Sequence, residues 1–278
     1  MKSTRLASEW FWTGVCVAAV GLTVVSLFAI VADVAIKGIA DFNLAFFTKL
    51  PPLPNAKPSS GGLANAIQGS LILVAGACAV GIPIGIISGI YISEFGSGLY
   101  GSVLSFLGDV LAGIPSIVTG ILVFTLIVLP LHAFSVVAGS IALGSIMIPI
   151  VSSTTAQSLR AVPNSVREGS LALGVGKWRT TMVVFGSAKS GVATASLYAT
   201  ARAMGETAPI LLTVGSSAFW FSGAWSPVAT LTYYIYDYAT SSTPNWIALA
   251  WTAALVLMLI VLGINVAVRI VTRRTTHP

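Results

Sequence analysis

Two opposite charges interrupt one of the most apolar parts of this sequence. Arg202 and Glu206 stand in the run GVATASLYATARAMGETAPILLTVG (191–215), which contains no other Asp, Glu, Lys or Arg. A charged side chain within a membrane helix is costly, so it normally pairs or faces a water-filled cavity. If the run is one helix, a spacing of four places both charges on the same face. The pair predicts either a static ion pair that locks the helix or the lining of an anion path.

The residues around this pair fit an anion path. In that interpretation, Glu206 limits the affinity of Arg202 for the anion, or changes partner between two states of the protein. Thr207 is adjacent and can donate a hydroxyl hydrogen bond. Pro209 loosens the helix just beyond, where a gate would be useful.

Two more polar features lie in apolar runs. The hydroxyl cluster Ser152–Thr155 comes late in one run, and we add Ser153 to the candidate path. Hydroxyls in helices nevertheless bond to backbone carbonyls more often than to ligands. Asp109 lies early in another run. It either pairs with a basic group of a neighbouring helix or subunit, or lies at the cytoplasmic interface, which we favour.

The segment 159–191 is the most polar part of the chain and holds five of its fourteen basic residues. Pro163 suits the first turn of a short helix. Gly174 or Gly176 can end that helix, because glycine readily adopts the left-handed conformation of a C-terminal cap. A second helix then begins near Lys177. A short amphipathic helix followed by a glycine break predicts either a knob that docks on a partner or a helix that lies on the lipid surface.

Nothing in the sequence predicts catalysis or a metal site. The nucleotide-binding pattern G-x4-G-K-[ST] is absent, and no nucleophile stands with a suitable base. Cys16 and Cys78 fall in expected helices, where we interpret them as small core residues and not as a disulfide or metal pair. His132 and His277 have no partners at ligand spacing. We expect a non-catalytic protein without bound cofactors.

The composition shows what must position these residues. The 278 residues are 56% hydrophobic and only 8% charged, whereas soluble domains carry about 25% charged residues. Runs of about 20 apolar residues span a membrane as helices, and these runs are too long and uniform for barrel strands. We predict an all-α polytopic membrane protein, with an uncleaved first helix. The chain has about six transmembrane helices in this prediction, at residues 10–36, 65–93, 102–129, 135–158, 189–214 and 246–270.

The basic residues predict the orientation of these helices, because cytoplasmic segments are enriched in Lys and Arg. With the N-terminus inside, ten basic residues lie on the cytoplasmic side and three on the outside. Both termini are therefore expected in the cytoplasm. We treat 1–278 as one transmembrane domain with a long outer loop at 37–64 and a cytoplasmic loop at 159–188. No basic face remains free for nucleic acid, so the surroundings are membrane lipid and protein partners.

Glycine and proline interrupt three of the expected helices, at GIPIG (81–85), GIPSIVTG (113–120) and IPIV (148–151). Small residues let membrane helices approach closely. Proline frees backbone carbonyls, which is tolerated where they face protein or a water-filled path. Each interruption alone indicates tight packing, but their recurrence favours a mobile bundle that encloses a cavity.

The cytoplasmic loop resembles that of a known family. Glu168-x5-Gly174 resembles the EAA loop of ABC importer permeases, with Gly169 and Ser170 in place of the two alanines and without the terminal Leu-Pro. Longer blocks resemble the phosphate-specific permeases of the PstA type. These blocks are LPPLPNAKPSSGGLANAIQGS (50–70), IPIGIISGIYISEFG (82–96), GDVLAGIPSIVTG (108–120), VPNSVREGSLALGVGKWRT (162–180) and ARAMGETAPILLT (201–213).

The resemblance implies a type I ABC importer permease (MetI-like) bundle that moves inorganic phosphate into the cytoplasm by alternating access. The implied partners are a second, homologous permease subunit, an ATPase dimer that uses ATP and Mg, and an extracytoplasmic phosphate-binding protein. The implied location is a bacterial-type cytoplasmic membrane. Coupling to the ATPase falls on the loop residues Arg167, Glu168, Leu173 and Gly174.

The sequence departs from the resembled permeases at one place in the candidate anion path. Similar permeases can carry an R-T-T-E pattern where this chain has Ser153 and Ala156. Any charge needed there must come from another group, such as one of the partner subunit.

Three other functions are compatible with the sequence. One is a permease for sulfate or molybdate. Another is a proton-coupled secondary carrier that uses Arg202 and Glu206 as its relay. The third is a scaffold or sensor subunit that transports nothing. The loop expected to dock on a partner argues against the secondary carrier, because a carrier that works alone needs no docking helix.

Overall fold

The computed structural model describes residues 2–54 and 61–275. Every regular element in this part of the chain is helical, so the all-α prediction is confirmed. The α-helices are α1 (Lys2–Gly38), α2 (Leu44–Thr48), α3 (Ala64–Ile90), α4 (Leu99–Gly113), α5 (Ser116–Val123), α6 (Leu129–Leu131), α7 (Val136–Arg160), α8 (Asn164–Ala172), α9 (Lys177–Met204), α10 (Ala208–Thr213), α11 (Leu231–Ala239) and α12 (Pro244–Thr275). Two π-helical turns, η1 (Tyr91–Phe95) and η2 (Phe124–Val128), continue α3 and α5.

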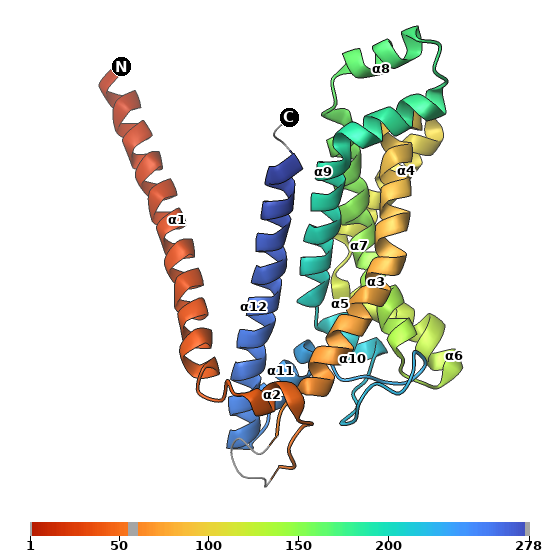
Figure 1. Ribbon diagram of the computed structural model, residues 1–278. Helices are drawn as coiled ribbons and strands as arrows, with labels where there is room; N and C mark the ends of the chain where they lie inside the picture. The colour runs from red at the N-terminus through yellow and green to blue at the C-terminus, as the bar shows by residue number, and fades with distance from the viewer. Residues whose placement is uncertain (1, 55–60, 276–278) are drawn as a thin grey trace.

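The long helices run back and forth along one direction (Figure 1). Four of them are long and apolar enough to cross a membrane: Glu9–Gly38, Ala64–Phe95, Val136–Arg160 and Pro244–Ala267. Leu99–Gly113 and Ser116–Leu131 are apolar enough only when taken together, and they form either a fifth, broken span or a re-entrant loop. The start of α1 and the end of α12 lie at the same end of the molecule as α8 (Figure 1).

The third expected helix, 102–129, is sharply broken. Its two parts meet at an angle of 101°, and the break falls at Ile114 and Pro115. Ile114 is extended, with ψ of 128°, because a residue before proline is pushed out of the helical region. Pro83 and Pro149 instead lie inside continuous helices.

The expected helix at 189–214 is not continuous either. Helix α9 begins earlier, at Lys177, and ends at Met204; α10 follows at Ala208–Thr213. Gly205 caps α9, and Pro209 lies in the first turn of α10, so the chain turns between them. Helix α9 packs against α7 and α12 within the bundle.

Among the described elements, helices α3 and α7 form the most extensive contact, along a row of glycines. A β-carbon added to Gly81 would lie 2.8 Å from the backbone oxygen of Gly144, and one on Gly85 would lie 2.6 Å from Cβ of Val151. A β-carbon added to Gly89 would lie 2.6 Å from the backbone oxygen of Ser152. Only glycine permits this separation, so the GIPIG interruption serves close packing, as expected for small residues in membrane helices.

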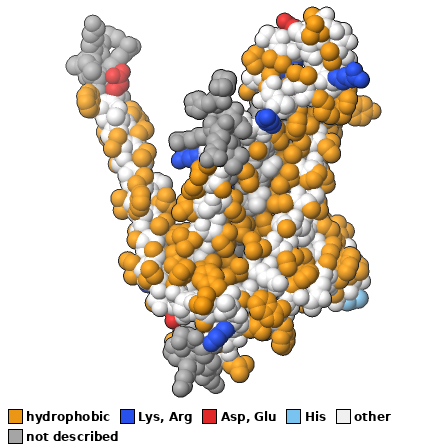
Figure 2. Space-filling model, viewed as in Figure 1, with side chains coloured by type: hydrophobic (Ala, Val, Ile, Leu, Met, Phe, Trp, Pro, Cys, Tyr) orange, Lys and Arg blue, Asp and Glu red, His pale blue; other side chains and the backbone are white. Residues whose placement is uncertain are grey.

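Helix α1 stands apart from this bundle (Figure 1). Apolar side chains cover its visible surface (Figure 2), and it joins α12 only near its end, where Thr252 donates a hydrogen bond of 3.0 Å to the Gly38 oxygen. Cys16 is exposed on this helix, so its predicted place in a core is wrong. Cys78 is half-buried, and its sulfur lies 3.2 Å from the Thr200 hydroxyl.

The segment 216–243, between α10 and α12, is rich in aromatic residues and contains one helix, α11. Thr230 caps it, with its hydroxyl accepting from the Tyr233 N–H. Buried Asn65 of α3 donates to the Ser217 oxygen at 2.9 Å and thereby ties the segment to the bundle. The segment therefore packs as part of the protein at the end opposite α8.

The close packing at the glycine row predicts that glycine-to-alanine substitution lowers stability within the row but not on α1. Gly85→Ala should destabilise the chain by about 1–3 kcal/mol, because the added methyl overpacks the contact with Val151. Gly21→Ala is the matched control: nothing lies within 4 Å of its β-carbon, and alanine favours the helix. Thermal unfolding in detergent measures both. Equal stability of the two variants would contradict the close contact.

Candidate functional site

Arg202 and Glu206 lie on either side of the break between α9 and α10. Arg202 is in the last turn of α9, whereas Glu206 and Thr207 follow the helix end. Their side chains form an ion pair with 3.7 Å between Nε and Oε1. The prediction of one continuous helix is wrong, but a turn at Gly205 still brings the charges together.

This pair is loose. A distance of 3.7 Å exceeds that of a hydrogen bond, and the Arg202 side chain is 52% exposed while that of Glu206 is 15% exposed. The guanidinium therefore keeps donors that can turn to an anion. Arg202 lines a small cavity of about 210 Å³ together with Ile114 and Ser116 at the break between α4 and α5.

The two helix breaks face each other. Gly120 of α5 lies against α10, since a β-carbon added to it would lie 2.8 Å from Cα of Pro209. Pro149 of α7 lines the same cavity as Arg202. In many transporters, discontinuous helices of this kind line the substrate site near the middle of the membrane.

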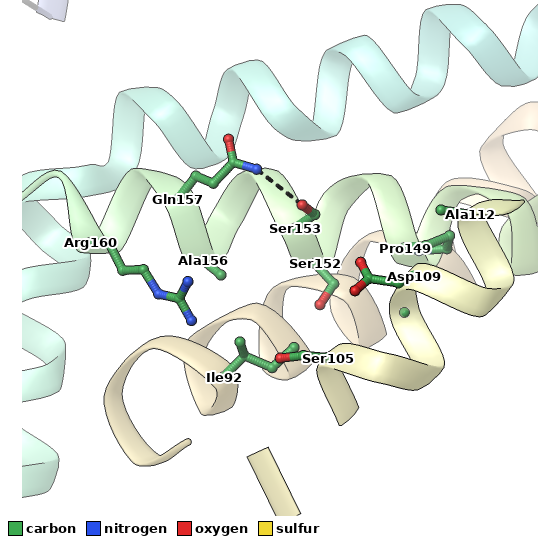
Figure 3. A pocket seen from close by; sticks show the side chains of 11 residues that line it. Ile92, Ser105, Asp109, Ala112, Pro149, Ser152, Ser153, Ala156, Gln157 and Arg160 are labelled. Atoms are coloured by element: carbon green, nitrogen blue, oxygen red, sulfur yellow. Dashed lines mark hydrogen bonds between the residues drawn. The ribbon is translucent and has the colours of Figure 1, made fainter. Parts of the chain in front are cut away.

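A second, more polar pocket of about 250 Å³ lies between α4 and α7 (Figure 3). It shares Ala112 and Pro149 with the Arg202 cavity, so the two are neighbours along α7. Its polar lining residues are Ser105, Asp109, Ser152, Ser153, Gln157 and Arg160.

The charges of this pocket point into it from two helices. Figure 3 shows the Asp109 carboxylate from α4 and the Arg160 guanidinium from α7 on opposite sides, with Ser152 between them. No ion pair within 4 Å joins either charge to another described residue. Gln157 donates to the Ser153 hydroxyl at 3.1 Å. The pocket therefore offers an unpaired cation, hydroxyl donors and one carboxylate to a small polar ligand.

Three polar residues of this pocket are not among the sequence candidates: Ser105, Gln157 and Arg160. In the sequence, Arg160 indicates only topology. The available signal was helical spacing: Ser153, Gln157 and Arg160 are four and then three residues apart, which places them on one face of α7. Arg160 supplies a positive charge to the pocket that Ser153 also lines.

The loop at 159–188 forms the expected short helix. Helix α8 follows Pro163 and ends before Gly174, which has a left-handed φ of 77°, and α9 begins at Lys177. Glu168 is exposed and Leu173 is 84% exposed. Val166 packs inward. The outer face of α8 is thus free to meet a partner.

Arg167 does not belong to that outer face. Its guanidinium turns inward and binds Glu94 of η1, with 2.7 Å between Nη2 and Oε1. These hydrogen bonds raise the pKa of Arg167 above its ordinary value, so the residue is charged. Within this chain its guanidinium is committed to Glu94, and its expected role in coupling to an ATPase stays a prediction.

Among the described residues, no group of three or more His, Cys, Asp or Glu could hold a metal ion. His132 lies in the turn after α6 with a φ of 49°, and His277 lies outside the described residues.

Comparison with known proteins identifies relatives along most of the chain. Residues 81–277 match the family described as binding-protein-dependent transport system inner membrane component. The phosphate transport system permease protein PstA of Yersinia pestis is 41% identical over 243 residues, covering 87% of this chain and 82% of that protein. The PstA protein of Haemophilus influenzae is 40% identical and covers 84% and 83%.

A solved structure shares the fold. The inward-facing MetNI methionine ABC transporter has a chain that superposes with a TM-score of 0.63 at 16% identity. The superposition covers 77% of this chain and 97% of that one. At this identity the likeness concerns the fold alone.

The pocket between α4 and α7 should contain water in the membrane. In a chain whose native cysteines are replaced by alanine, Ser153→Cys should react with a hydrophilic thiol reagent at least about tenfold faster than Thr155→Cys, since reaction requires access. Ser153 is exposed in the pocket, whereas Thr155 is buried in the same helix. Equal, slow reaction of both thiols would show that lipid or protein fills the pocket.

Proposed function

The chain belongs to the family of binding-protein-dependent transport system inner membrane components and, within it, to the phosphate transport system permeases, and we propose that it carries inorganic phosphate into the cell. It is a multi-pass protein of the inner membrane and a permease subunit of an ATP-driven importer. The observation that carries the proposal is the relationship of about 40% identity along more than four fifths of the chain.

The two adjoining cavities along α7 support phosphate as the solute. Phosphate is a small oxyanion that accepts several hydrogen bonds, and guanidinium groups bind it with charge-assisted ones. Arg202 lines one cavity and Arg160 the other. Ser153 and Ser152 add hydroxyls, and Thr207 lies at the helix break. A phosphate ion can pass from one arginine to the other within the protein.

The carboxylates near the two arginines keep the binding of phosphate reversible. Glu206 lies 3.7 Å from Arg202, and Asp109 shares the pocket of Arg160. Glu206 competes with phosphate for the Arg202 guanidinium, and the negative charge of Asp109 repels the anion in the other pocket. Both effects lower affinity, which a transporter needs in order to release its solute.

The partners follow from the family. A second permease subunit completes the path on the open side of the α4–α7 pocket, and an extracytoplasmic binding protein delivers phosphate. An ATPase dimer receives α8 through Glu168, Leu173 and the turn at Gly174. ATP and Mg act in that dimer, and this chain binds neither. Closure of the dimer moves α8 and shifts the permease between outward- and inward-facing states, provided that the dimer closes differently on each.

The excess of basic residues indicates the orientation. The end of the bundle that carries α8 and both termini (Figure 1) also carries most of the Lys and Arg residues, and these normally stay in the cytoplasm. The aromatic segment around α11 then faces the binding protein.

Phosphate uptake by the assembled complex in liposomes tests the function. Wild type should take up labelled phosphate only with ATP inside, and unlabelled phosphate should compete where sulfate and molybdate do not. Uptake driven by a pH gradient without ATP, or equal competition by sulfate, would contradict the proposal.

Arg202 should be needed for this uptake. Arg202→Gln should lower uptake by about 10- to 100-fold, since a charged hydrogen bond is worth about 1.5–3 kcal/mol. Arg202→Lys, which keeps the charge, should lose less. Lys189→Gln is the matched control, because it removes an exposed charge from the same helix. If Arg202→Gln transports as well as Lys189→Gln does, the ion pair is merely structural.

A further inference from the structure

We propose that Glu94 and Arg167 form the rigid joint through which α8 moves the transmembrane bundle. Arg167 lies on α8 and Glu94 in η1, at the end of α3. Both are positioning residues that touch no phosphate. The proposal rests on the proposed function, because it requires an ATPase that moves α8.

The Arg167 guanidinium is fully occupied. Its Nε and Nη2 donate to the two carboxylate oxygens of Glu94 at 3.3 and 2.7 Å. Nη2 also donates to the Leu159 oxygen at 2.8 Å, and Nη1 donates to the Val162 oxygen at 2.7 Å and to Asn164 Oδ1 at 3.4 Å. A guanidinium has five N–H donors, and these five contacts use them all.

Because every donor of the Arg167 guanidinium has an acceptor, the joint is rigid. The side chains of Arg167 and Glu94 are only 20% and 8% exposed, so opening the pair would leave charges poorly solvated. Leu159 lies in the last turn of α7. One side chain of α8 therefore holds the ends of both α7 and α3, and α8 cannot move without them.

The π-turn η1 also contacts the other end of the loop. The Phe95 ring lies 6.4 Å from that of Trp178, and Lys177 Nζ lies 4.8 Å from the centre of the Phe95 ring. Both partners belong to the first turn of α9. The coupling segment is thus held to η1 at α8 and at α9, on both sides of the Gly174 break.

The same five-residue turn reaches the candidate path. Ile92 of η1 lines the pocket with Asp109 and Arg160 (Figure 3), two residues before Glu94 in the chain. A displacement of α8 that pulls on Glu94 must therefore shift the wall of that pocket. π-turns within helices often occur at functional sites, and this one links the docking helix to the path.

The first test separates coupling from activity. In the complete complex in liposomes, ATP hydrolysis and phosphate uptake are measured on the same sample. Glu94→Gln should keep ATP hydrolysis but lower the phosphate taken up per ATP by about tenfold. Glu94→Asp, which keeps the charge, should recover part of the loss. Glu9→Gln, an exposed carboxylate on α1, is the control and should match wild type.

The outcomes distinguish the two proposals. If wild type shows no ATP-dependent phosphate uptake, the proposed function fails. If wild type transports and Glu94→Gln moves the same phosphate per ATP, even at a lower yield of complex, the pair is merely structural and the joint is refuted.

A second test leaves the pair intact, so it does not depend on the folding of a variant. Spin labels are placed at Ser97→Cys and Ser165→Cys, two exposed positions beside η1 and on α8, in a chain whose native cysteines are replaced by alanine. A rigid joint predicts the same distance between the labels with and without ATP. A change in that distance with ATP would overturn the proposal.

Discussion

The close contact of α3 with α7 is the interaction on which this structure depends. Lipid chains are as apolar as the side chains, so membrane helices associate through packing and not through the hydrophobic effect. The glycine row at 81, 85 and 89 lets α7 approach α3 closely. One face of α7 is thereby committed to α3, and another face, with Ser153 and Arg160, lines the polar pocket. A movement that enters through α3 is transmitted to the path because no flexible layer separates the two helices.

The number of hydrogen-bond and ion-pair partners divides these arginines into two kinds. Arg167 has every donor satisfied and connects three elements. Arg202 has a loose partner at 3.7 Å, and Arg160 faces a pocket without a close ion-pair partner among the described residues. Satisfied arginines hold structure together, whereas those with spare donors can bind a passing oxyanion. The phosphate permease uses the same side chain for both purposes, and the local environment decides which.

Sequence reasoning was sound where one segment determines its own structure. Hydropathy located α1, α3, α7 and α12 to within several residues, and Pro163 with Gly174 bounded α8. The motif blocks led to the family that the comparisons confirm. Reasoning from one segment was weaker at the helix breaks: the proline at 115 indicated an interruption but not an angle of 101°.

Contacts between segments far apart in the sequence could not be predicted from local patterns. Glu94 and Arg167 are 73 positions apart, and no local pattern shows that they meet. Arg160 lines the pocket only because α4 lies opposite it. Arg202 and Glu206 do meet, but through a turn at Gly205 and not along one helix. Cys16 is exposed because α1 leaves the bundle, which depends on tertiary packing and not on its own apolar sequence.

The most direct test of coupling between α8 and the α4–α7 pocket measures the width of that pocket. With spin labels at Ser105→Cys on α4 and Ser153→Cys on α7, the distance across the pocket is measured in the complete complex, without nucleotide and with ATP bound. The account predicts two different distances, because α8 moves η1 and with it the wall of the pocket. One unchanged distance, in a complex that still transports phosphate, would contradict it.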